Sequence, residues 1–310
     1  MNTDIEVTNM VMDEVKKVVI GKDNVIKRIM TCFLAKGHVL IDDIPGVGKT
    51  TMAMAFSKAM ALKQNRIQFT PDVMPSDVTG FTIFDKSTNT FKYKKGAVIC
   101  NLLLADEINR TSSKTQSALL EAMEELRVTV DGNVYEFPKP FLVIATQNPV
   151  GSVGTHMLPE SQLDRFTIMI NMGYPSIENE IDMLKGKHMK NPMDDIKPII
   201  NAEKLVLLQE SAEKVFIHDR IYRYIAKIAA ATRNHQKIKL GISPRGSVAL
   251  CRMSKANAFL EGRDYVIPDD VMEVAADTLS HRILLNPKSR IEGKSTKEIL
   301  LDIIENTPLN

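Results

Sequence analysis

The stretch from residue 38 to residue 51 constrains the fold of this chain more than any other. It reads HVLIDDIPGVGKTT, which is an apolar run, a turn containing Pro and Gly, and a helix predicted from Thr50. Gly46 and Gly48 let the backbone approach a ligand closely and direct its N–H groups inward. Lys49 can then reach the β- and γ-phosphates, and the Thr50 hydroxyl can bind Mg²⁺. The pattern therefore predicts a strand, a phosphate-binding loop and a helix.

The loop departs from the common pattern G-x-x-x-x-G-K-[ST] at one position. Asp43 stands where the first Gly is usual. Taken alone, the loop is also compatible with a Gly-rich turn before a helix, with Lys49 as a surface residue. The residues that follow favour the phosphate site.

Apolar runs and turn signals predict an α/β arrangement up to about residue 175. Strands are expected at residues 37–42, 66–70, 102–106, 141–146 and 166–170. Helices are expected at residues 4–18, 22–36, 49–62 and 113–125. Two hairpins are predicted at residues 81–94 and 127–137, the second around an Asp-Gly turn.

The character of the sequence changes near residue 175. No further strand pattern is found, and helices are expected at residues 176–189, 202–213, 219–233, 244–261 and 268–283. We therefore predict an α/β domain over residues 1–175 and a smaller all-helical domain over residues 176–310.

Polar residues follow two of the predicted strands where each strand ends. Asp106 and Glu107 end one apolar strand, and Asn148 follows the next. Ligands bind at the carboxyl ends of strands in α/β sheets, so these residues should face the same crevice as the loop. Asp106 is placed to hold Mg²⁺ and Glu107 to deprotonate an attacking water. Asn148 could hold that water or a γ-phosphate oxygen, although an isolated Asn-Pro more often marks a turn.

Two arginines complete the set. Arg165 precedes the last strand, and from a sheet edge it would reach the nucleotide of a neighbouring copy rather than its own. The simpler interpretation is a surface arginine paired with Asp164 or Glu160. Arg245 lies at a predicted helix start, where it could contact the γ-phosphate and report nucleotide state to the helical domain.

Composition limits the remaining classes. A net charge of +2 gives no bulk electrostatic case for nucleic acid, although Lys92-Tyr93-Lys94-Lys95 is locally basic. The three cysteines, Cys32, Cys100 and Cys251, are far apart and predict buried thiols in a reducing compartment, without a metal cluster. No membrane span or signal peptide is expected, which favours a cytoplasmic protein.

Several sequence motifs together resemble those of the AAA+ ATPases, and their residues are similar to those of the MoxR type. They are DIPGVGKT (43–50), QFTPDVMPSDVTG (68–80), LLLADEINR (102–110), KTQSALLEAME (114–124), ATQNP (145–149), LPESQLDRF (158–166) and Ser243-Pro244-Arg245. The likeness runs from about residue 10 to about residue 285, and the Asp at the first Gly position is familiar in this family.

The resemblance implies an AAA+ P-loop αβα sandwich with a five-stranded parallel sheet, followed by a helical lid. It implies a Walker B motif at 102–107 with Asp106 and Glu107, a sensor 1 at Asn148, an arginine finger at Arg165 and a sensor 2 at Arg245. It also implies a Walker A loop at 43–50, with ATP bound by Pro45, Gly46, Val47, Gly48, Lys49, Thr50 and the following Thr51, and with Mg²⁺ held by Thr50 and Asp106. Ile20 and Gly21 resemble the segment that lines the adenine pocket. Both hairpins look like those that face the pore in related rings.

What the resemblance implies about function is a Mg-ATP-hydrolysing, chaperone-like remodelling or maturation factor for a protein client. Similar proteins form hexameric rings and often act with a von Willebrand factor A-type partner. Three alternatives stay open at this point: a nucleic-acid translocase or loader, a magnesium-chelatase-type motor subunit, and a scaffold that binds ATP with little turnover. The basic hairpin supports the first, and the intact Glu107 argues against the last.

Overall fold

A central sheet of five parallel strands organises the first half of the chain. The computed structural model describes residues 2–44, 46–148, 158–186 and 192–309. The strand order is β2–β5–β8–β1–β9. The strands are β1 (Val39–Asp42), β2 (Gln64–Gln68), β5 (Leu102–Asp106), β8 (Leu142–Gln147) and β9 (Ile168–Ile170). The predicted five-stranded parallel sheet is confirmed, and β9 lies at its edge next to β1.

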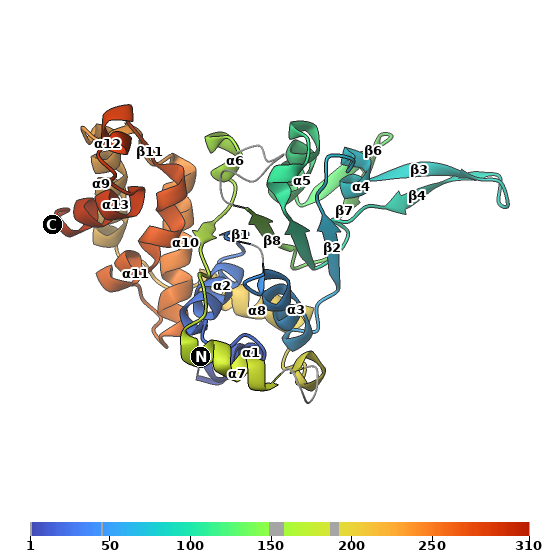
Figure 1. Cartoon of the computed structure of the whole chain (residues 1–310), viewed down its shortest axis with the longest axis horizontal. Coiled ribbons are helices and arrows are strands. Elements are labelled where there is room, and N and C mark those ends of the chain that lie inside the picture. The colour runs from blue at the N-terminus through green and yellow to red at the C-terminus, as the bar shows by residue number, and fades with distance from the viewer. Residues whose placement is uncertain (1, 45, 149–157, 187–191, 310) are drawn as a thin grey trace.

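The sheet is covered on both faces, as continuous apolar strands require. Val39 and Ile41 of β1 point to one face, where they join an apolar cluster with Phe33 and Phe56, whereas Leu40 points to the other. Figure 1 shows α1 (Asn2–Lys16), α2 (Asp23–Leu34) and α3 (Lys49–Ala59) on one side of the sheet, and α5 (Ser113–Glu125) on the other.

Both predicted hairpins are present. β3 (Gly80–Asp85) pairs with β4 (Thr90–Lys95), and β6 (Arg127–Val130) pairs with β7 (Asn133–Glu136). The first hairpin projects far from the body of the molecule (Figure 1). The rings of Tyr93 and Tyr135 stack with centroids 3.8 Å apart, so the two hairpins contact each other. The Pro-rich stretch before β3 contains the short helix α4 (Pro75–Thr79), with Pro75 at the helix start where proline is tolerated.

Helices dominate the chain after residue 175. They are α7 (Ile177–Gly186), α8 (Ala202–Glu213), α9 (Asp219–Asn234), α10 (Pro244–Leu260), α11 (Pro268–Leu279), α12 (Pro287–Ile291) and α13 (Thr296–Glu305). Figure 1 shows α9 to α13 gathered as a group beside the sheet, while α7 and α8 lie near α1 to α3. None of the helices in the described ranges is long and apolar enough to cross a membrane.

The prediction that this half contains no strand was wrong. β10 (Ile238–Leu240) and β11 (Leu284–Leu285) form a two-stranded antiparallel ribbon. Strands of three and two residues are too short for an alternating pattern to be visible in the sequence. Residues 280–282, expected to continue the helix of α11, form a separate 3₁₀ turn. The domain boundary near residue 175 falls between β9 and α7 and stays a prediction.

Candidate nucleotide site

The carboxyl ends of β5 and β8 and the amino end of α3 border one cavity of about 340 Å³. Its walls are formed by Gly46, Gly48, Lys49, Thr50, Thr51, Arg66, Gln68, Asp106, Glu107 and Asn148. The polar residues predicted from separate strand ends are therefore brought together, because β5 and β8 are neighbours and β8 also pairs with β1.

The loop between β1 and α3 leaves open space for a ligand. Gly46 and Gly48 have φ values of +88° and +93°, which L side chains rarely adopt. A Cβ added at either glycine would meet no heavy atom within 4 Å, so the cradle is open on that side. Pro45 lies outside the described residues, and Val47 is packed, partly buried, against the apolar core.

Lys49 begins α3 and points back across the loop. Its Nζ donates to the carbonyl oxygen of Asp43 over 2.5 Å. Burial lowers the pKa of Lys49, and the nearby carboxylates, with Asp43 and Asp106 foremost, oppose that shift only in part. Within the described residues this ammonium group donates to one neutral carbonyl, so it is available to bind an anion such as phosphate.

Asp106 and Thr50 supply the oxygen atoms that a Mg²⁺ ion prefers. Thr50 Oγ1 lies 3.5 Å from Asp106 Oδ2. The other carboxylate oxygen accepts a hydrogen bond from Thr146 Oγ1 over 2.7 Å, which fixes the orientation of the group. A hydroxyl and a carboxylate side by side at a phosphate loop fit a Mg²⁺ ion that completes its shell with water and phosphate oxygens.

Arg66 was not predicted as a site residue. It projects from β2, and its Nη2 donates to Asp106 Oδ2 over 2.8 Å. The sequence gives little signal for it, since RIQF reads as an ordinary strand and the contact depends on β2 pairing with β5.

Glu107 is held in a backbone conformation that is uncommon outside glycine, with φ at +56°. Its Oε1 accepts from Asn148 Nδ2 over 3.1 Å, and its Oε2 accepts from Arg110 Nη1 over 2.7 Å. Burial alone would raise the pKa of Glu107, but the hydrogen bonds from Arg110 and Asn148 outweigh it and lower the pKa below its usual value. The side chain is therefore an ionised carboxylate at neutral pH.

Asn148 has one polar atom left over. Its amide nitrogen bonds Glu107, whereas its buried Oδ1 has no hydrogen-bond partner among the described residues. Asn109 fixes the Asn148 backbone from both sides, as acceptor from its N–H over 3.3 Å and as donor to its carbonyl over 3.0 Å. An acceptor without a partner in the described ranges, on a residue that lines the cavity, suits a ligand or water that carries a donor.

Asp43, the residue that departs from the common loop pattern, bonds the chain beyond β9. Its Oδ2 accepts from the backbone N–H groups of Met172 and Gly173 over 2.6 and 2.7 Å. Lys22 Nζ donates to the carbonyl oxygens of the same two residues, over 2.5 and 3.0 Å, and to that of Tyr174 over 3.0 Å. These contacts clamp the segment that leaves the sheet for α7 against the start of the loop.

Ile20 and Gly21, the expected adenine segment, adjoin this clamp but do not line the cavity. Gly21 has φ at +72°, and a Cβ there would lie 1.9 Å from Asn179 Nδ2 of α7. The positive φ therefore favours glycine at this position, and a larger residue would also have to displace the Asn179 side chain.

Comparison with known proteins shows the family of this chain. Residues 38–168 match the ATPase family associated with various cellular activities (AAA), and residues 230–303 match the AAA lid domain. YeaC of Bacillus subtilis, an uncharacterized protein, is 47% identical over 293 residues, which is 94% of this chain and 92% of YeaC. The chaperone MoxR1 of Mycobacterium tuberculosis is 38% identical over 305 residues, covering 96% of this chain and 80% of MoxR1. The chain belongs to the MoxR family of AAA+ ATPases.

A solved structure also matches this MoxR-family chain over nearly its whole length. This structure is the crystal structure of a protein from Cytophaga hutchinsonii that has been assigned as an ATPase. It superposes on this chain with a TM-score of 0.92 at 38% sequence identity. The match covers 99% of this chain and 96% of that one. The AAA+ fold with a helical lid is thus established for both halves of the chain.

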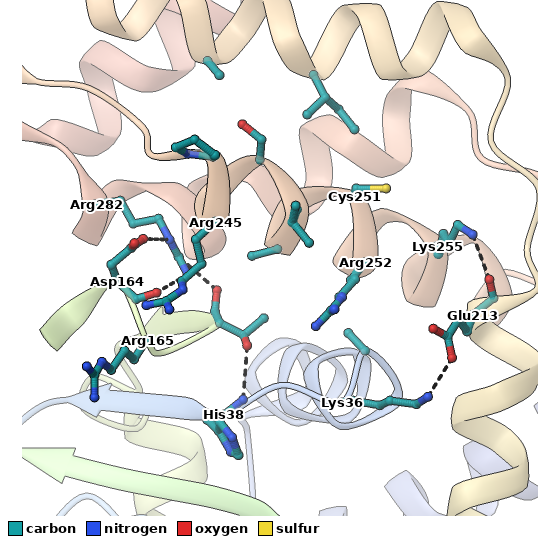
Figure 2. Close-up of a pocket in the computed structure, with 18 of the residues that line it drawn as sticks. Lys36, His38, Asp164, Arg165, Glu213, Arg245, Cys251, Arg252, Lys255 and Arg282 are labelled. Carbon is teal, nitrogen blue, oxygen red and sulfur yellow. Dashed lines mark hydrogen bonds and ion pairs between the residues drawn. The ribbon is translucent and has the colours of Figure 1, made fainter. Parts of the chain in front are cut away.

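The two arginines of this MoxR-family chain lie away from the nucleotide cavity. Arg165 and Arg245 line a second cavity, of about 970 Å³, between α5, α9 and α10. Arg165 Nε lies 3.5 Å from Glu124 Oε2, and an Arg245 Nη atom bonds Glu124 Oε1. Figure 2 shows both guanidinium groups on the same side of this cavity. The structure therefore separates them from Lys49 and Asp106 and brings them together with each other.

Proposed function

We propose that this chain hydrolyses Mg-ATP and uses the energy to remodel or mature a protein client. The observation that carries the proposal is the convergence of Lys49, Thr50, Asp106, Glu107 and Asn148 on one cavity next to an open glycine loop. Membership of the AAA+ ATPases and the likeness to a protein named as a chaperone, MoxR1, support the same assignment.

Each residue has a distinct role in the proposed reaction. Gly46 and Gly48 leave room for phosphate oxygens against backbone N–H groups, and Lys49 exchanges its bond to Asp43 for bonds to the phosphates. Thr50 and Asp106 would hold a Mg²⁺ ion, which would supply charge neutralisation for the phosphate oxygens. The cavity of about 340 Å³ and the donor groups that line it support the proposal that a triphosphate binds there.

Glu107 acts as the base that removes a proton from the attacking water. Its low pKa keeps it ionised, and the Asn148 and Arg110 bonds fix both carboxylate oxygens. Asn148 orients the water through Oδ1, the acceptor that has no protein partner among the described residues. In this proposal, Glu107 removes the proton while the water that Asn148 orients attacks the γ-phosphate.

Arg165 and Arg245 serve the nucleotide of a neighbouring copy in a ring, which we propose to be a hexamer. Both line the cavity beside Glu124 rather than the one that holds Lys49, and Arg165 precedes the edge strand β9. Guanidinium groups supplied across an interface stabilise the charge of a transferring phosphoryl group. Arg245 was expected to contact the γ-phosphate, and its position beside Arg165 supports contact with the same neighbour's nucleotide.

The first hairpin is the proposed contact with the client. It exposes Phe84 and Phe91, whose rings meet edge to face with centroids 5.2 Å apart, on a projection from the body. Its basic residues are already engaged in part, since Lys92 Nζ bonds Asp85 over 2.6 Å and Lys94 lies over the Phe81 ring. Exposed aromatic groups favour a protein surface over a phosphate backbone here.

The finer assignments complete the proposal. We propose the domain division at about residue 175, a cytoplasmic location, and a von Willebrand factor A-type partner on the strength of the family likeness.

The direct test is the rate of phosphate release from Mg-ATP by the purified chain, measured over a range of protein concentrations. We expect the rate of phosphate release per chain to rise with protein concentration, and we expect Lys49→Ala to release no phosphate. A chain that releases no phosphate at any concentration would refute the proposal.

A further inference from the structure

Two polar residues behind the arginines join the segments that carry them. Asp164 immediately precedes Arg165, and Ser243 caps the helix on whose first turn Arg245 lies. Ser243 Oγ donates to the Asp164 carboxylate, at 3.0 Å from Oδ1 and 2.9 Å from Oδ2. The hydrogen bond between Ser243 and Asp164 therefore joins the backbone segment that carries Arg165 to the one that carries Arg245.

Arg282 reinforces this connection from the lid. Its Nε donates to Asp164 Oδ1 over 2.8 Å. Its Nη2 donates to the carbonyl oxygens of Asp164 and Phe166, over 3.2 and 2.6 Å, and its Nη1 to that of Thr167 over 3.2 Å. One guanidinium therefore bonds the chain on both sides of Arg165.

Arg282 also packs against the helix that carries Arg245. A Cβ added at Gly246, the residue after Arg245, would lie 2.8 Å from the Arg282 Cδ atom. The Arg282 side chain is 2% exposed, whereas those of Arg165 and Arg245 are 32% and 45% exposed. Figure 2 shows Asp164 linked to Arg282, beside Arg245 and next to Arg165. Arg282, which is buried, and Asp164, which is 20% exposed, form a hydrogen-bonded base from which the two more exposed arginines project.

The exposed pair can bind a single anionic group. Arg165 and Arg245 both contact one carboxylate, that of Glu124. Two guanidinium groups that meet on one carboxylate are close enough to meet on one phosphate, which offers similar oxygen acceptors.

We propose that Asp164 and Arg282 are positioning residues that hold Arg165 and Arg245 as one pair for the nucleotide of a neighbouring copy. The inference rests on the proposed function, because it assumes that arginines are shared between copies. It adds that the segment before β9 and the lid move together, so that both arginines reach or leave the neighbour's site at once.

The test uses mixtures of variants of the full-length chain. Asp164→Asn alone should lose about tenfold or more of the phosphate-release rate, because an arginine finger is worth far more than that. Its ATP affinity should stay within about threefold of the unchanged chain, since its own cavity is intact. Arg282→Lys, which keeps the positive charge but has fewer N–H groups, should behave in the same way.

Mixing identifies which side of the shared site is damaged. Mixed in equal amounts with Lys49→Ala, which keeps both arginines, Asp164→Asn should regain about a quarter of the normal rate, because one site in four joins an intact loop to an intact arginine pair. Mixed with Arg165→Ala, Asp164→Asn should regain nothing, because both variants damage the donated arginines. A variant that merely misfolds would regain activity with neither partner.

Two controls separate the possible failures. Lys49→Ala mixed with Arg165→Ala must regain activity, and if it does not, the sharing of arginines in the proposed function is wrong. Glu213→Gln removes a carboxylate on the same cavity wall that pairs with Lys36 over 2.6 Å, and it should hydrolyse normally. Three results would overturn the positioning role. The first is normal hydrolysis by Asp164→Asn, and the second is regained activity when Asp164→Asn is mixed with Arg165→Ala. The third is that neither Asp164→Asn nor Arg282→Lys regains activity with either partner.

Discussion

The side-chain amide of Asn148 donates to Glu107 Oε1 over 3.1 Å, and this bond joins the residues that follow two neighbouring strands. It joins the proposed base to Asn148, whose Oδ1 has no hydrogen-bond partner in the described part of the chain, and both residues line one cavity. The bond exists because β5 and β8 pair in parallel, so that their carboxyl ends face the same side.

Asn148→Ala should therefore reduce turnover more than binding. The change removes one of the two bonds that fix the Glu107 carboxylate and the acceptor proposed for the attacking water. We expect kcat to fall by about 10² and the ATP dissociation constant to change by less than about threefold, as for the loss of a group that acts in the transition state. Steady-state phosphate release and nucleotide titration measure the two quantities.

Asn101→Ala is the matched control for that change. Asn101 is also a buried asparagine, but it lies at the amino end of β5, where its Nδ2 donates to Pro140 O over 3.0 Å. Its loss should lower stability and leave kcat close to normal. If both alanine variants reduced kcat equally, the effect of Asn148 would be one of stability alone.

Asp43→Gly restores the common loop pattern and should loosen the clamp beyond β9. The variant loses the carboxylate that accepts from Met172 and Gly173, and hydrogen bonds to a charged group contribute about 1.5–3 kcal/mol each. We expect a lower melting temperature and faster hydrogen exchange at residues 171–174, measured by mass spectrometry. ATP binding should persist, because the glycine form of the loop is the usual one. Unchanged exchange at these residues would show that the clamp does not hold them in solution.

His38 should make the chain less stable in mild acid. Its Nδ1 accepts from the Val143 N–H over 3.2 Å, so Nε2 carries the proton and donates to Met123 O over 3.2 Å. Burial lowers the pKa of His38 from 6.5 to about 4, although the bond to Met123 opposes the shift. Between these values the unfolded chain binds the proton and the folded chain does not. The free energy of unfolding should therefore fall by about 3 kcal/mol as pH drops from about 6.5 to about 4, and change no further below that from this residue.

The measurement is denaturant unfolding at a series of pH values for the unchanged chain and for His38→Gln. A Gln amide can accept from Val143 and donate to Met123 but does not titrate, so it should remove the part of the pH dependence that His38 contributes. His218→Asn, at an exposed helix cap, should leave the slope as it is. Equal slopes for all three proteins would contradict the assignment to His38.

The sequence predicts the parts of this site that depend on one strand or one loop. A glycine loop after an apolar strand, and Asp106 and Glu107 at the end of another, need only the rule that parallel strands end at the same edge. Asp43 behaves differently. Its partners Met172 and Gly173 lie far away in the sequence, and the loop pattern describes Asp43 only as a departure from glycine.

The same limit applies to the arginines. Motif spacing identifies Arg165 and Arg245 but not that they meet at Glu124, because that contact depends on how α10 packs beside the sheet. Arg282 gives no sequence signal at all, since its role follows from burial against Asp164. The short strands β10 and β11 were missed because pairing, not local pattern, defines them.

The most direct measurement of the central claim compares Glu107→Gln with the unchanged chain in Mg-ATP binding and phosphate release. If Glu107 removes the proton from the attacking water, the amide should hold ATP with near-normal affinity and release phosphate at least about 100-fold more slowly. Undiminished phosphate release by Glu107→Gln would contradict the account, because the cavity at the carboxyl ends of β5 and β8 would not then be where hydrolysis takes place.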